Sequence, residues 1–491
     1  MRLDKSSLYF FIILNILVVG LITGASYYHI PLQGGKDTLV YLVHLISLQV
    51  TVAGVLYVLS LSRLFFNWLL CPLLFFYAGF AFLGYSQDIS ITPHLLQAIL
   101  ETKADIAVDL INLPFLLYLG STALLLFGMA RWRARLKSVK FFSLNTFMAF
   151  ICMGLYPTLE ALRPGSLQNR LPYNLVYALA EYTQQPSLKL NLNPELELIK
   201  YQDSLLVVLV VGESVRADHL SINGYDRKTT PKLSATPGLL SFPNISTTHT
   251  YTGASLPQIL TDQGQERKDQ TYTSIYSVWN KGGFNSYWIG NQTLERSYAP
   301  VVNTNDTVVL IDAFKSVFSF DKRKDADLLE PFKAFLPQAS RSVVSLHMIG
   351  SHWWYEDRYT DKERIFTPVI DSKYIPALSP KQLINAYDNT LVYLDGFLAL
   401  LIETLEQTKI PSVMIYISDH GEQLGEDGKW LHAQAGDAAK NPAYLMWFSQ
   451  DYQRQHPETL EYFTEAVKQK STTDRVFYDL LLISGLKYLP N

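Results

Sequence analysis

The chain has 491 residues, of which 48% are hydrophobic and 17% are charged, so it is too long for one ordinary domain and too apolar to be wholly soluble. Its formal net charge of −3 argues against a protein whose main partner is nucleic acid, because such proteins concentrate basic residues on one face. Its two cysteines, Cys71 and Cys152, both lie in apolar segments, so disulfides cannot hold the polar half together.

Five segments in the first third of the chain contain no Asp, Glu, Lys or Arg. Each is long enough to supply the roughly 20 helical residues that cross the hydrocarbon of a membrane. The sequence therefore predicts a five-helix transmembrane domain over residues 1–160. The uncharged segments are residues 6–35, 38–62, 64–87, 110–130 and 141–159.

The basic residues between these segments predict the orientation. Arg2 and Lys5 precede the first segment, Arg63 separates the second from the third, and residues 131–140 carry five basic residues between the fourth and the fifth. All three positions fall on one side of the membrane. The positive-inside rule then makes the amino terminus cytoplasmic, and an odd number of spans places everything after about residue 160 outside.

Residues 161–202 differ from both of their neighbours, because they are polar and rich in proline. They include a short amphipathic stretch, residues 175–182, which fits a helix lying in the membrane interface. An ordinary linker with one or two helical turns is the alternative. We expect this segment to bridge the membrane domain and an outer domain.

The remaining residues, 203–491, read as an α/β domain. Residues 204–211 form an almost continuous run of Leu and Val, which is typical of a parallel strand buried on both faces. Similar strands are predicted at residues 342–346 and 412–417, with a helix at residues 380–407. Alternating strands and helices predict an open, mainly parallel sheet whose ligands bind at the carboxyl ends of the strands.

Polar side chains follow each of the three predicted strands. Glu213 follows the first, His347 and His352 follow the second, and Asp419 and His420 follow the third. Carboxylates with an imidazole are suitable zinc ligands and leave a position for a reacting oxygen. The sequence therefore predicts a metal centre at this edge of the sheet.

A nucleophile is expected in residues 246–257, which contain several Ser and Thr hydroxyls between the first two metal-binding strands. A free threonine hydroxyl is a weak nucleophile, and metal coordination ionises it at neutral pH. The nucleophile should therefore complete the metal shell, but the residues alone do not select one hydroxyl.

Nearly the whole chain resembles the phosphoethanolamine transferases of the Gram-negative envelope, which belong to the alkaline phosphatase and sulfatase superfamily. The most specific pieces of the resemblance are Gly212-Glu-Ser-Val-Arg-Ala-Asp-His-Leu-Ser-Ile-Asn-Gly-Tyr-Asp-Arg, Thr248-His-Thr-Tyr-Thr, Trp288-Ile-Gly-Asn-Gln, Ala386-Tyr-Asp-Asn-Thr and Ser418-Asp-His-Gly-Glu-Gln-Leu-Gly-Glu. It implies a periplasmic sulfatase-like catalytic domain at residues 203–491, carried by a multi-pass inner-membrane domain.

The resemblance also implies roles for individual residues. Glu213, Asp419 and His420 would bind zinc together with Thr250, which would be the nucleophile. The transferred phosphate would be held by His347 and His432. Glu101, in the loop predicted on the outer side between the third and fourth spans, would lie near the ethanolamine ammonium group, and His352 is a further substrate-binding candidate.

Two features depart from the family pattern. Ser351-His352-Trp353-Trp354 stands where many relatives have Asn-His-Gly-Pro, so the two tryptophans would reshape one wall of the site. Relatives that modify lipid A often carry disulfides in the outer domain, whereas this chain has no cysteine there. The acceptor therefore stays open among lipid A, core sugars, a periplasmic glucan and a protein glycan.

The resemblance implies transfer of phosphoethanolamine from phosphatidylethanolamine to a sugar hydroxyl, with lipid A or the lipopolysaccharide core as the first-choice acceptor. The reaction would pass through a zinc-bound phosphothreonine. Zinc is expected in preference to Mn²⁺, and we expect a monomer. The alternatives are a phosphoglycerol transferase of the lipoteichoic acid synthase type, or a membrane regulator that retains an inactive transferase fold.

Overall fold

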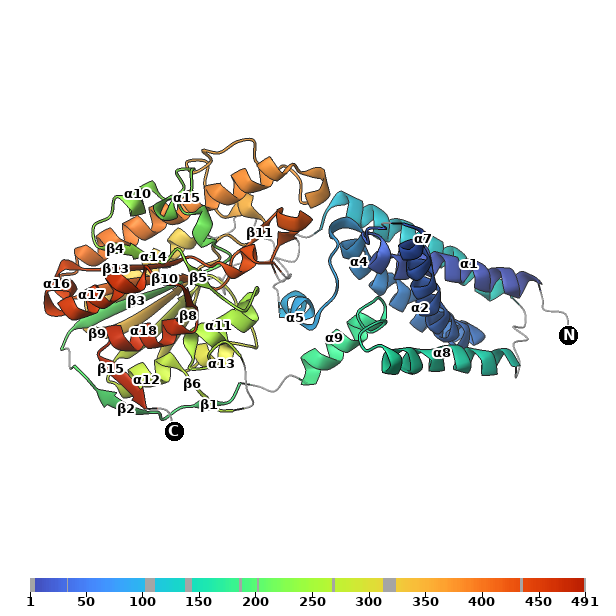
Figure 1. Ribbon diagram of the computed structural model, residues 1–491, viewed down its shortest axis with the longest axis horizontal. Coiled ribbons are helices and arrows are strands. Elements are labelled where there is room, and N and C mark those ends of the chain that lie inside the picture. The colour runs from blue at the N-terminus through green and yellow to red at the C-terminus, as the bar shows by residue number, and fades with distance from the viewer. Residues whose placement is uncertain are drawn as a thin grey trace. The chain divides into compact units, whose positions relative to one another are not determined.

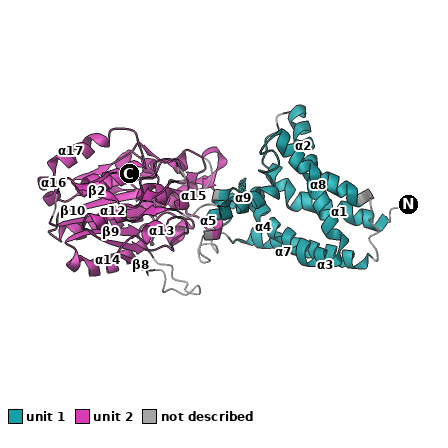
Figure 2. Ribbon diagram, turned by 90° about the horizontal axis from the view of Figure 1, so that it is seen from below, with its two compact units in different colours: residues 1–97, 110–185, 374–377 teal, residues 98–109, 186–373, 378–491 magenta. Residues whose placement is uncertain are grey.

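The computed structural model describes residues 5–32, 34–101, 111–136, 144–184, 188–200, 203–266, 270–311, 324–432 and 436–489. The chain forms two compact units, which Figure 2 shows in two colours. Unit 1 comprises residues 1–97, 110–185 and 374–377, and unit 2 comprises residues 98–109, 186–373 and 378–491.

Unit 1 is helical. Three of its helical stretches, Gly35–Leu61, Arg63–Gln87 and Leu113–Arg135, are long and apolar enough to cross a membrane, and Lys5–Leu21 and Thr146–Leu162 are shorter apolar helices. That all five helices cross the membrane therefore remains a prediction, because two of them are shorter. The helices are α1 (Lys5–Leu21), α2 (Gly35–Leu61), α3 (Arg63–Phe65), α4 (Cys71–Gln87), α5 (Pro93–Glu101), α7 (Leu113–Arg135), α8 (Leu144–Leu162) and α9 (Tyr173–Gln184).

A buried arginine caps the carboxyl end of α2. Arg133, near the end of α7, is buried and donates hydrogen bonds of 2.6 Å to the Ser60 carbonyl and 2.7 Å to the Leu61 carbonyl. These carbonyls end α2 and have no partner within their own helix. The carboxyl ends of α2 and α7 therefore lie side by side.

Unit 2 is built on a seven-stranded sheet with the order β4-β13-β10-β3-β9-β7-β8. β13 runs opposite to the other six strands, so the predicted mainly parallel sheet is confirmed. The strands of this sheet are β3 (Leu205–Gly212), β4 (Leu239–Ser241), β7 (Asn285–Gly290), β8 (Thr307–Leu310), β9 (Arg341–His347), β10 (Ser412–Ser418) and β13 (Tyr444–Phe448).

Helices cover both faces of the sheet. Figure 1 shows α15 on one side and α12 and α18 on the other. All eight residues of β3 are buried, as expected for a central strand between two helical layers. The helices of unit 2 are α10 (Pro231–Ser234), α11 (Thr252–Leu260), α12 (Ile275–Lys281), α13 (Ala299–Val302), α14 (Leu329–Phe335), α15 (Pro380–Glu406), α16 (Gln450–Gln455), α17 (Pro457–Ala466) and α18 (Arg475–Ile483).

Short strands outside the main sheet pair two by two. The pairs are β1 (Leu190–Asn191) with β6 (Tyr272–Thr273), β2 (Glu195–Leu198) with β15 (Leu486–Leu489), β5 (Ile245–Ser246) with β14 (Ser471–Thr472), and β11 (Gln423–Leu424) with β12 (Trp430–Leu431). The β2–β15 pair joins a strand near the start of residues 186–373 to the last described strand of the chain.

The predicted strands and the long helix are present with small shifts. The first predicted strand ends one residue later, at Gly212, and the third also gains one residue, so both reach the polar residues that follow. Helix α15 begins at Pro380 as predicted. Helix α9 includes the predicted amphipathic stretch and exposes Val176, Tyr177 and Leu179, although its place in the membrane interface remains a prediction.

The first turn of α15 is fixed by a capping box. The Ser379 hydroxyl accepts the Gln382 N–H at 3.3 Å, and Gln382 Oε1 accepts the Ser379 N–H at 3.0 Å. We expect Ser379→Ala to lower the free energy of local opening in this turn by about 1 kcal/mol. Amide hydrogen exchange of residues 382–386 measures this. Ser379→Asp, which can still cap, should retain the protection, and equal exchange in the alanine variant would contradict the assignment.

Candidate active site

The strand register brings the two predicted carboxylates together. Gly212 of β3 pairs with Ser418 of β10, so Glu213 and Asp419 are the first residues beyond the ladder on neighbouring parallel strands. Glu213 is 1% exposed and Asp419 is fully buried. Two carboxylates in the same dry site repel each other, and such an arrangement needs a compensating cation.

His420 lies between these carboxylates. Its Nε2 atom is 3.3 Å from Glu213 Oε1 and 3.2 Å from Asp419 Oδ2, while its Nδ1 donates to the Gly421 carbonyl at 2.7 Å. Among the residues that the structure describes, no hydrogen bond of acceptable geometry reaches His420 Nε2 or Asp419 Oδ2, although both atoms are buried. Buried polar atoms are normally satisfied, so these two atoms fit the ligand set of a metal ion.

Two further imidazoles lie beside His420. Glu213, His420 and His432 each offer a ligand atom, and these atoms all lie within 4.8 Å of one another. The His432 ring centroid is 4.8 Å from that of His420 and 5.2 Å from that of His352. The structure therefore brings His352 and His432 together at the metal-capable cluster.

The orientation of His352 and His432 is set by their Nδ1 atoms. His352 Nδ1 donates to the Trp353 carbonyl at 2.6 Å, and His432 Nδ1 is 3.2 Å from Glu422 Oε2. Glu422 is fully buried. Partners of this kind fix the tautomer of an imidazole and leave its Nε2 for a ligand.

The threonine that meets the cluster is Thr252. Its hydroxyl donates a 3.0 Å hydrogen bond to Glu213 Oε2, and it is the first residue of α11. Among the described residues, Thr250 makes no hydrogen bond to Glu213, Asp419 or His420. The structure thus puts Thr252 in the place that the sequence analysis gave to Thr250, because the chain enters α11 only after Tyr251.

His347 lies apart from the cluster, between two aromatic rings. Its ring centroid is 5.1 Å from that of Trp288 and 5.8 Å from that of Tyr298, and neither ring nitrogen makes a hydrogen bond within the described part of the chain. Burial lowers the pKa of His347 to about 4, so the ring is neutral. This geometry gives His347 no direct contact with the other predicted ligands.

Glu101 is the last residue of α5, and its side chain lies outside the described part of the structure. Its predicted role near the ethanolamine group stays a prediction.

Ser214 connects the two carboxylates. Its N–H donates to Asp419 Oδ1 at 3.1 Å and its hydroxyl donates to Glu213 Oε1 at 2.8 Å. These contacts require the left-handed conformation of Ser214, at φ +60°. The Tyr387 hydroxyl holds this turn, because it donates to the Ser214 carbonyl at 2.8 Å and accepts the Arg216 N–H at 2.9 Å.

A second turn packs against Glu213 from the other side. Gly350 has φ +49°, and a Cβ there would come within 2.7 Å of the Glu213 carbonyl oxygen, so only glycine fits. Asp325 accepts the N–H of Gly350 at 2.9 Å and fixes the turn. Gln292 Nε2 lies 3.3 Å from Glu213 Oε2 and donates to the Met348 carbonyl at 2.6 Å.

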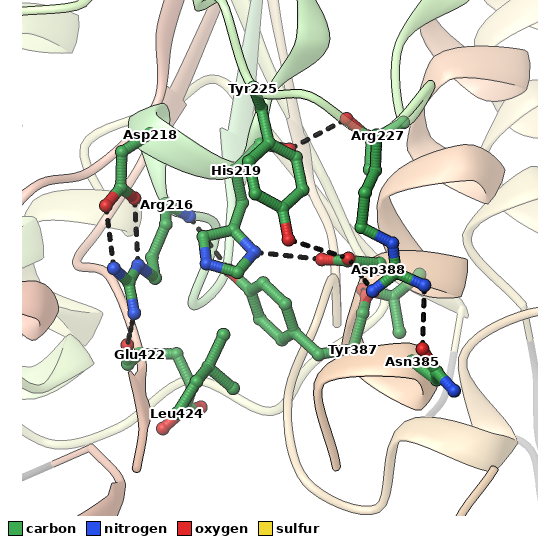
Figure 3. Close-up of polar contacts among 12 residues, drawn as sticks. Arg216, Asp218, His219, Tyr225, Arg227, Asn385, Tyr387, Asp388, Glu422 and Leu424 are labelled. Carbon is green, nitrogen blue, oxygen red and sulfur yellow. Dashed lines mark hydrogen bonds and ion pairs between the residues drawn. The ribbon is translucent and has the colours of Figure 1, made fainter. Parts of the chain in front are cut away.

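Beyond Tyr387, a polar network ties residues 216–227 to α15, as Figure 3 shows. Asp388 is buried and accepts from Arg227 at 2.6 Å and from Tyr225 at 3.0 Å, and its other oxygen is 2.9 Å from His219 Nδ1. Arg216 pairs with Asp218. These residues account for much of the sequence resemblance, but their contacts hold the loop that carries Glu213 and do not touch the cluster.

The pKa values of Glu213, Asp419 and His420 depend on one another. Burial and the charge of Glu213 raise the pKa of Asp419 to about 7. Burial alone would lower the pKa of His420, but Asp419 and Glu213 raise it to about 10. Burial also acts to raise the pKa of Glu213, but His420 holds it well below its usual value. In the metal-free cluster, a proton on His420 therefore serves as the compensating cation.

Sequence reasoning did not select Thr252 among the hydroxyls of residues 246–257, and it missed Ser214, Tyr387 and Gln292 as members of the site. A signal existed for Thr252, because the run from Gly253 to Leu260 reads as a buried helix, and a helix N-terminus stabilises an anionic oxygen or phosphate. The other three are identified by hydrogen bonds that no local pattern encodes.

Tyr387→Phe should weaken the binding of a divalent metal about tenfold, because the loop that presents Glu213 loses its anchor. Tyr393→Phe is the matched control, since its hydroxyl accepts the Ala326 N–H at 3.0 Å from the same helix. Chelator competition gives the affinity, and thermal unfolding of the metal-free proteins measures structural damage. Equal affinities in the two variants, or a loss of affinity explained by unfolding, would refute the positioning role.

The chain matches proteins of known family along most of its length. Phosphoethanolamine transferase EptA of Escherichia coli K12 is 29% identical, with 93% of this chain and 89% of that protein covered. The integral membrane protein lipooligosaccharide phosphoethanolamine transferase A of Neisseria meningitidis superposes with a TM-score of 0.82 at 24% identity, covering 98% of this chain and 96% of that one. This confirms the predicted fold class.

The periplasmic domain of EptC from Escherichia coli, crystallised in a complex with zinc, superposes with a TM-score of 0.54 at 26% identity and covers 61% of this chain and 87% of that domain. The sulfatase family model matches residues 206–484, which is more than half of the chain. The chain therefore belongs to the sulfatase family, and its full-length similarity supports the predicted assignment to the phosphoethanolamine transferases of the alkaline phosphatase and sulfatase superfamily.

Proposed function

We propose that the protein transfers phosphoethanolamine from phosphatidylethanolamine to a sugar hydroxyl of an envelope glycolipid or glycan, with lipid A or the lipopolysaccharide core as the first-choice acceptor. The observation that carries this proposal is the hydrogen bond from the Thr252 hydroxyl to Glu213 inside the carboxylate and histidine cluster. The transferred group follows from the relatives, which are phosphoethanolamine transferases.

We also propose that the cluster holds zinc. Glu213, Asp419 and His420 would be the ligands together with Thr252, since their oxygen and nitrogen atoms suit tetrahedral zinc. The buried atoms Asp419 Oδ2 and His420 Nε2, which make no hydrogen bond, support this fit. The ion would neutralise the two carboxylates and act as a Lewis acid toward the phosphoryl group.

The residues of the chain perform a two-step transfer. Thr252 Oγ1 attacks the donor phosphorus, and its proton passes through Glu213 Oε2 to the leaving lipid oxygen as the bond to diacylglycerol breaks, so diacylglycerol leaves as the alcohol. A sugar hydroxyl then attacks the phosphothreonine, and its proton returns by the same route to Thr252 Oγ1, which leaves as the free hydroxyl. His352 and His432 would hold the phosphoryl oxygens in their imidazolium form, because only that form carries a proton on Nε2 while Nδ1 donates to the Trp353 carbonyl or to Glu422.

The membrane unit fits this chemistry, because a lipid donor stays in the bilayer and a tethered enzyme meets it at high effective concentration. We place the catalytic unit in the periplasm and the amino terminus in the cytoplasm of a Gram-negative inner membrane, on the basis of the basic loops. We propose that the enzyme acts as a monomer.

The proposal is tested by incubating the full-length enzyme in detergent with phosphatidylethanolamine that carries an isotope label in ethanolamine, and with purified lipid A or lipopolysaccharide. Mass spectrometry should find diacylglycerol and an acceptor heavier by one phosphoethanolamine group. Phosphatidylglycerol serves as the rival donor. Transfer of phosphoglycerol, or no release of diacylglycerol from either lipid, would reject the proposed function.

Thr252→Ala should reduce transfer by about a thousandfold or more, because it removes the nucleophile. Thr250→Ala is the matched control, and it should keep activity within about threefold, because truncation of this half-buried side chain in the same segment leaves the nucleophile in place. Intact-mass analysis after donor is added without acceptor should find a covalent phosphoethanolamine adduct in wild type and in Thr250→Ala only. If the Thr252→Ala protein still formed the adduct, another hydroxyl would be the nucleophile.

Zinc affinity should rise with pH. Zinc needs the neutral imidazole of His420, but Asp419 and Glu213 raise the pKa of that group to about 10, so the metal must displace a proton at neutral pH. From pH 8 to pH 6 the apparent affinity should fall at least about tenfold, since protonation of Asp419 adds to the competition. Chelator competition across this range measures the effect, and a flat profile would contradict it.

A further inference from the structure

Unit 1 contains a cavity of 510 Å³ at one end of its helices. Its lining comes from the connection between α1 and α2, from the first three turns of α2, and from the segment that follows α8. The chain continues toward unit 2 from this last segment. The cavity therefore lies at the end of the helical unit from which the polypeptide leaves for the catalytic unit. Its lining residues are Tyr27, Ile30, Pro31, Leu32, Asp37, Val40, Tyr41, His44, Arg163, Pro164, Gly165, Ser166 and Arg170.

The segment after α8 is held in place by one carboxylate. Glu160, in the last turn of α8, accepts the N–H groups of Gly165 at 2.7 Å, Leu167 at 2.5 Å and Gln168 at 2.7 Å. These bonds fold the chain back over the helix end and fix the wall of the cavity. They also commit Glu160 to the backbone, so this carboxylate is not paired with a neighbouring arginine.

Two arginines of that segment give the cavity a positive wall. Arg170 donates to the Ser26 carbonyl at 2.9 Å and lies over the Tyr27 ring, with 5.3 Å from its guanidinium carbon to the ring centroid. Within the described residues, neither Arg163 nor Arg170 forms an ion pair. Asp37, at the start of α2, is the single carboxylate among the lining residues. Two guanidinium groups and one carboxylate that line the same cavity suit a ligand that carries both an anion and a cation.

The other wall of the cavity is apolar and open to the surroundings of the helix. Val40 is 58% exposed and Leu32 is 47% exposed, and Leu39 beside them is 63% exposed. Val40 belongs to α2, which is long and apolar enough to cross a membrane. Such side chains are covered by lipid hydrocarbon in a bilayer. A free phosphate ion has no apolar part that could contact this wall.

We propose that this cavity is a docking site for a zwitterionic phospholipid, which here is the donor of the proposed function. The phosphodiester lies between Arg163 and Arg170, the ammonium group faces Asp37, and an acyl chain follows the apolar side of α2 past Val40. By the orientation that the basic loops predict, the site lies in the outer leaflet. It is separate from the metal-capable cluster, which belongs entirely to unit 2.

The test uses the delipidated full-length enzyme and three arginine pairs. Arg163→Gln with Arg170→Gln removes both charges, and Arg163→Lys with Arg170→Lys keeps them. The matched control is Arg131→Gln with Arg135→Gln, near the end of α7, which lies at the other end of α2. Native mass spectrometry counts bound phosphatidylethanolamine, and phosphatidylglycerol and inorganic phosphate are parallel probes.

The glutamine pair should bind phosphatidylethanolamine about tenfold more weakly than wild type, with the lysine pair restoring most of the loss and the control pair unchanged. Asp37→Asn should remove the preference for phosphatidylethanolamine over phosphatidylglycerol. Inorganic phosphate should not compete. In transfer assays the glutamine pair should raise the KM for the lipid donor and leave kcat unchanged.

The proposal would be overturned if the control pair lost as much phosphatidylethanolamine binding as the glutamine pair, or if replacing both arginines left lipid binding unchanged. The bound lipid would then be the annular lipid that surrounds any membrane helix. Competition by inorganic phosphate would also overturn it, because the occupant would then be a simple anion. The outcome is independent of catalysis. If wild-type enzyme binds the lipid through these arginines but releases no diacylglycerol, the cavity inference stands and the proposed function fails.

Discussion

The arrangement of unit 2 depends on the burial of two carboxylates at the ends of neighbouring parallel strands. Glu213 and Asp419 follow β3 and β10 in matched register, so the sheet itself sets their separation. In a dry site this concentration of negative charge is unfavourable unless a cation lies between the groups. A proton on His420 can fill that role, and a divalent metal fills it better. The repulsion between the carboxylates of Glu213 and Asp419 thus favours the binding of a metal cation.

Three surrounding elements prevent the carboxylates from relaxing apart. Ser214 bonds to both of them, Tyr387 of α15 anchors the turn that Ser214 makes, and Gly350 allows a second turn to pack against the backbone of Glu213. The contacts of Asp388 extend this anchoring to the loop that ends near Arg227. Much of the sequence that resembles the family therefore serves to hold Glu213 and makes no contact with the reacting group itself.

The parts of this site that could be predicted are those that follow from strand ends. Continuous apolar runs located β3, β9 and β10, and the residues after β3 and β10, Glu213, Asp419 and His420, meet in the structure as expected. His347 could not be judged in this way, because it is the last residue of its strand and its ring packs between Trp288 and Tyr298. Thr250 and Thr252 differ by two residues, and only the start of α11 decides which hydroxyl reaches Glu213.

The helical unit shows a different limit of sequence reasoning. Long uncharged segments predict helices, but they do not reveal that Glu160 folds the chain back at the end of α8, where Arg163 and Arg170 form no ion pair with any described residue. An unpaired arginine in water costs little, whereas two arginines beside exposed valine and leucine at the end of an apolar helix face both water and hydrocarbon. A phospholipid satisfies both surroundings at once, because its phosphate meets the guanidinium groups while its acyl chains cover the apolar wall. The same contacts that stabilise this end of the helical unit would therefore recruit the substrate.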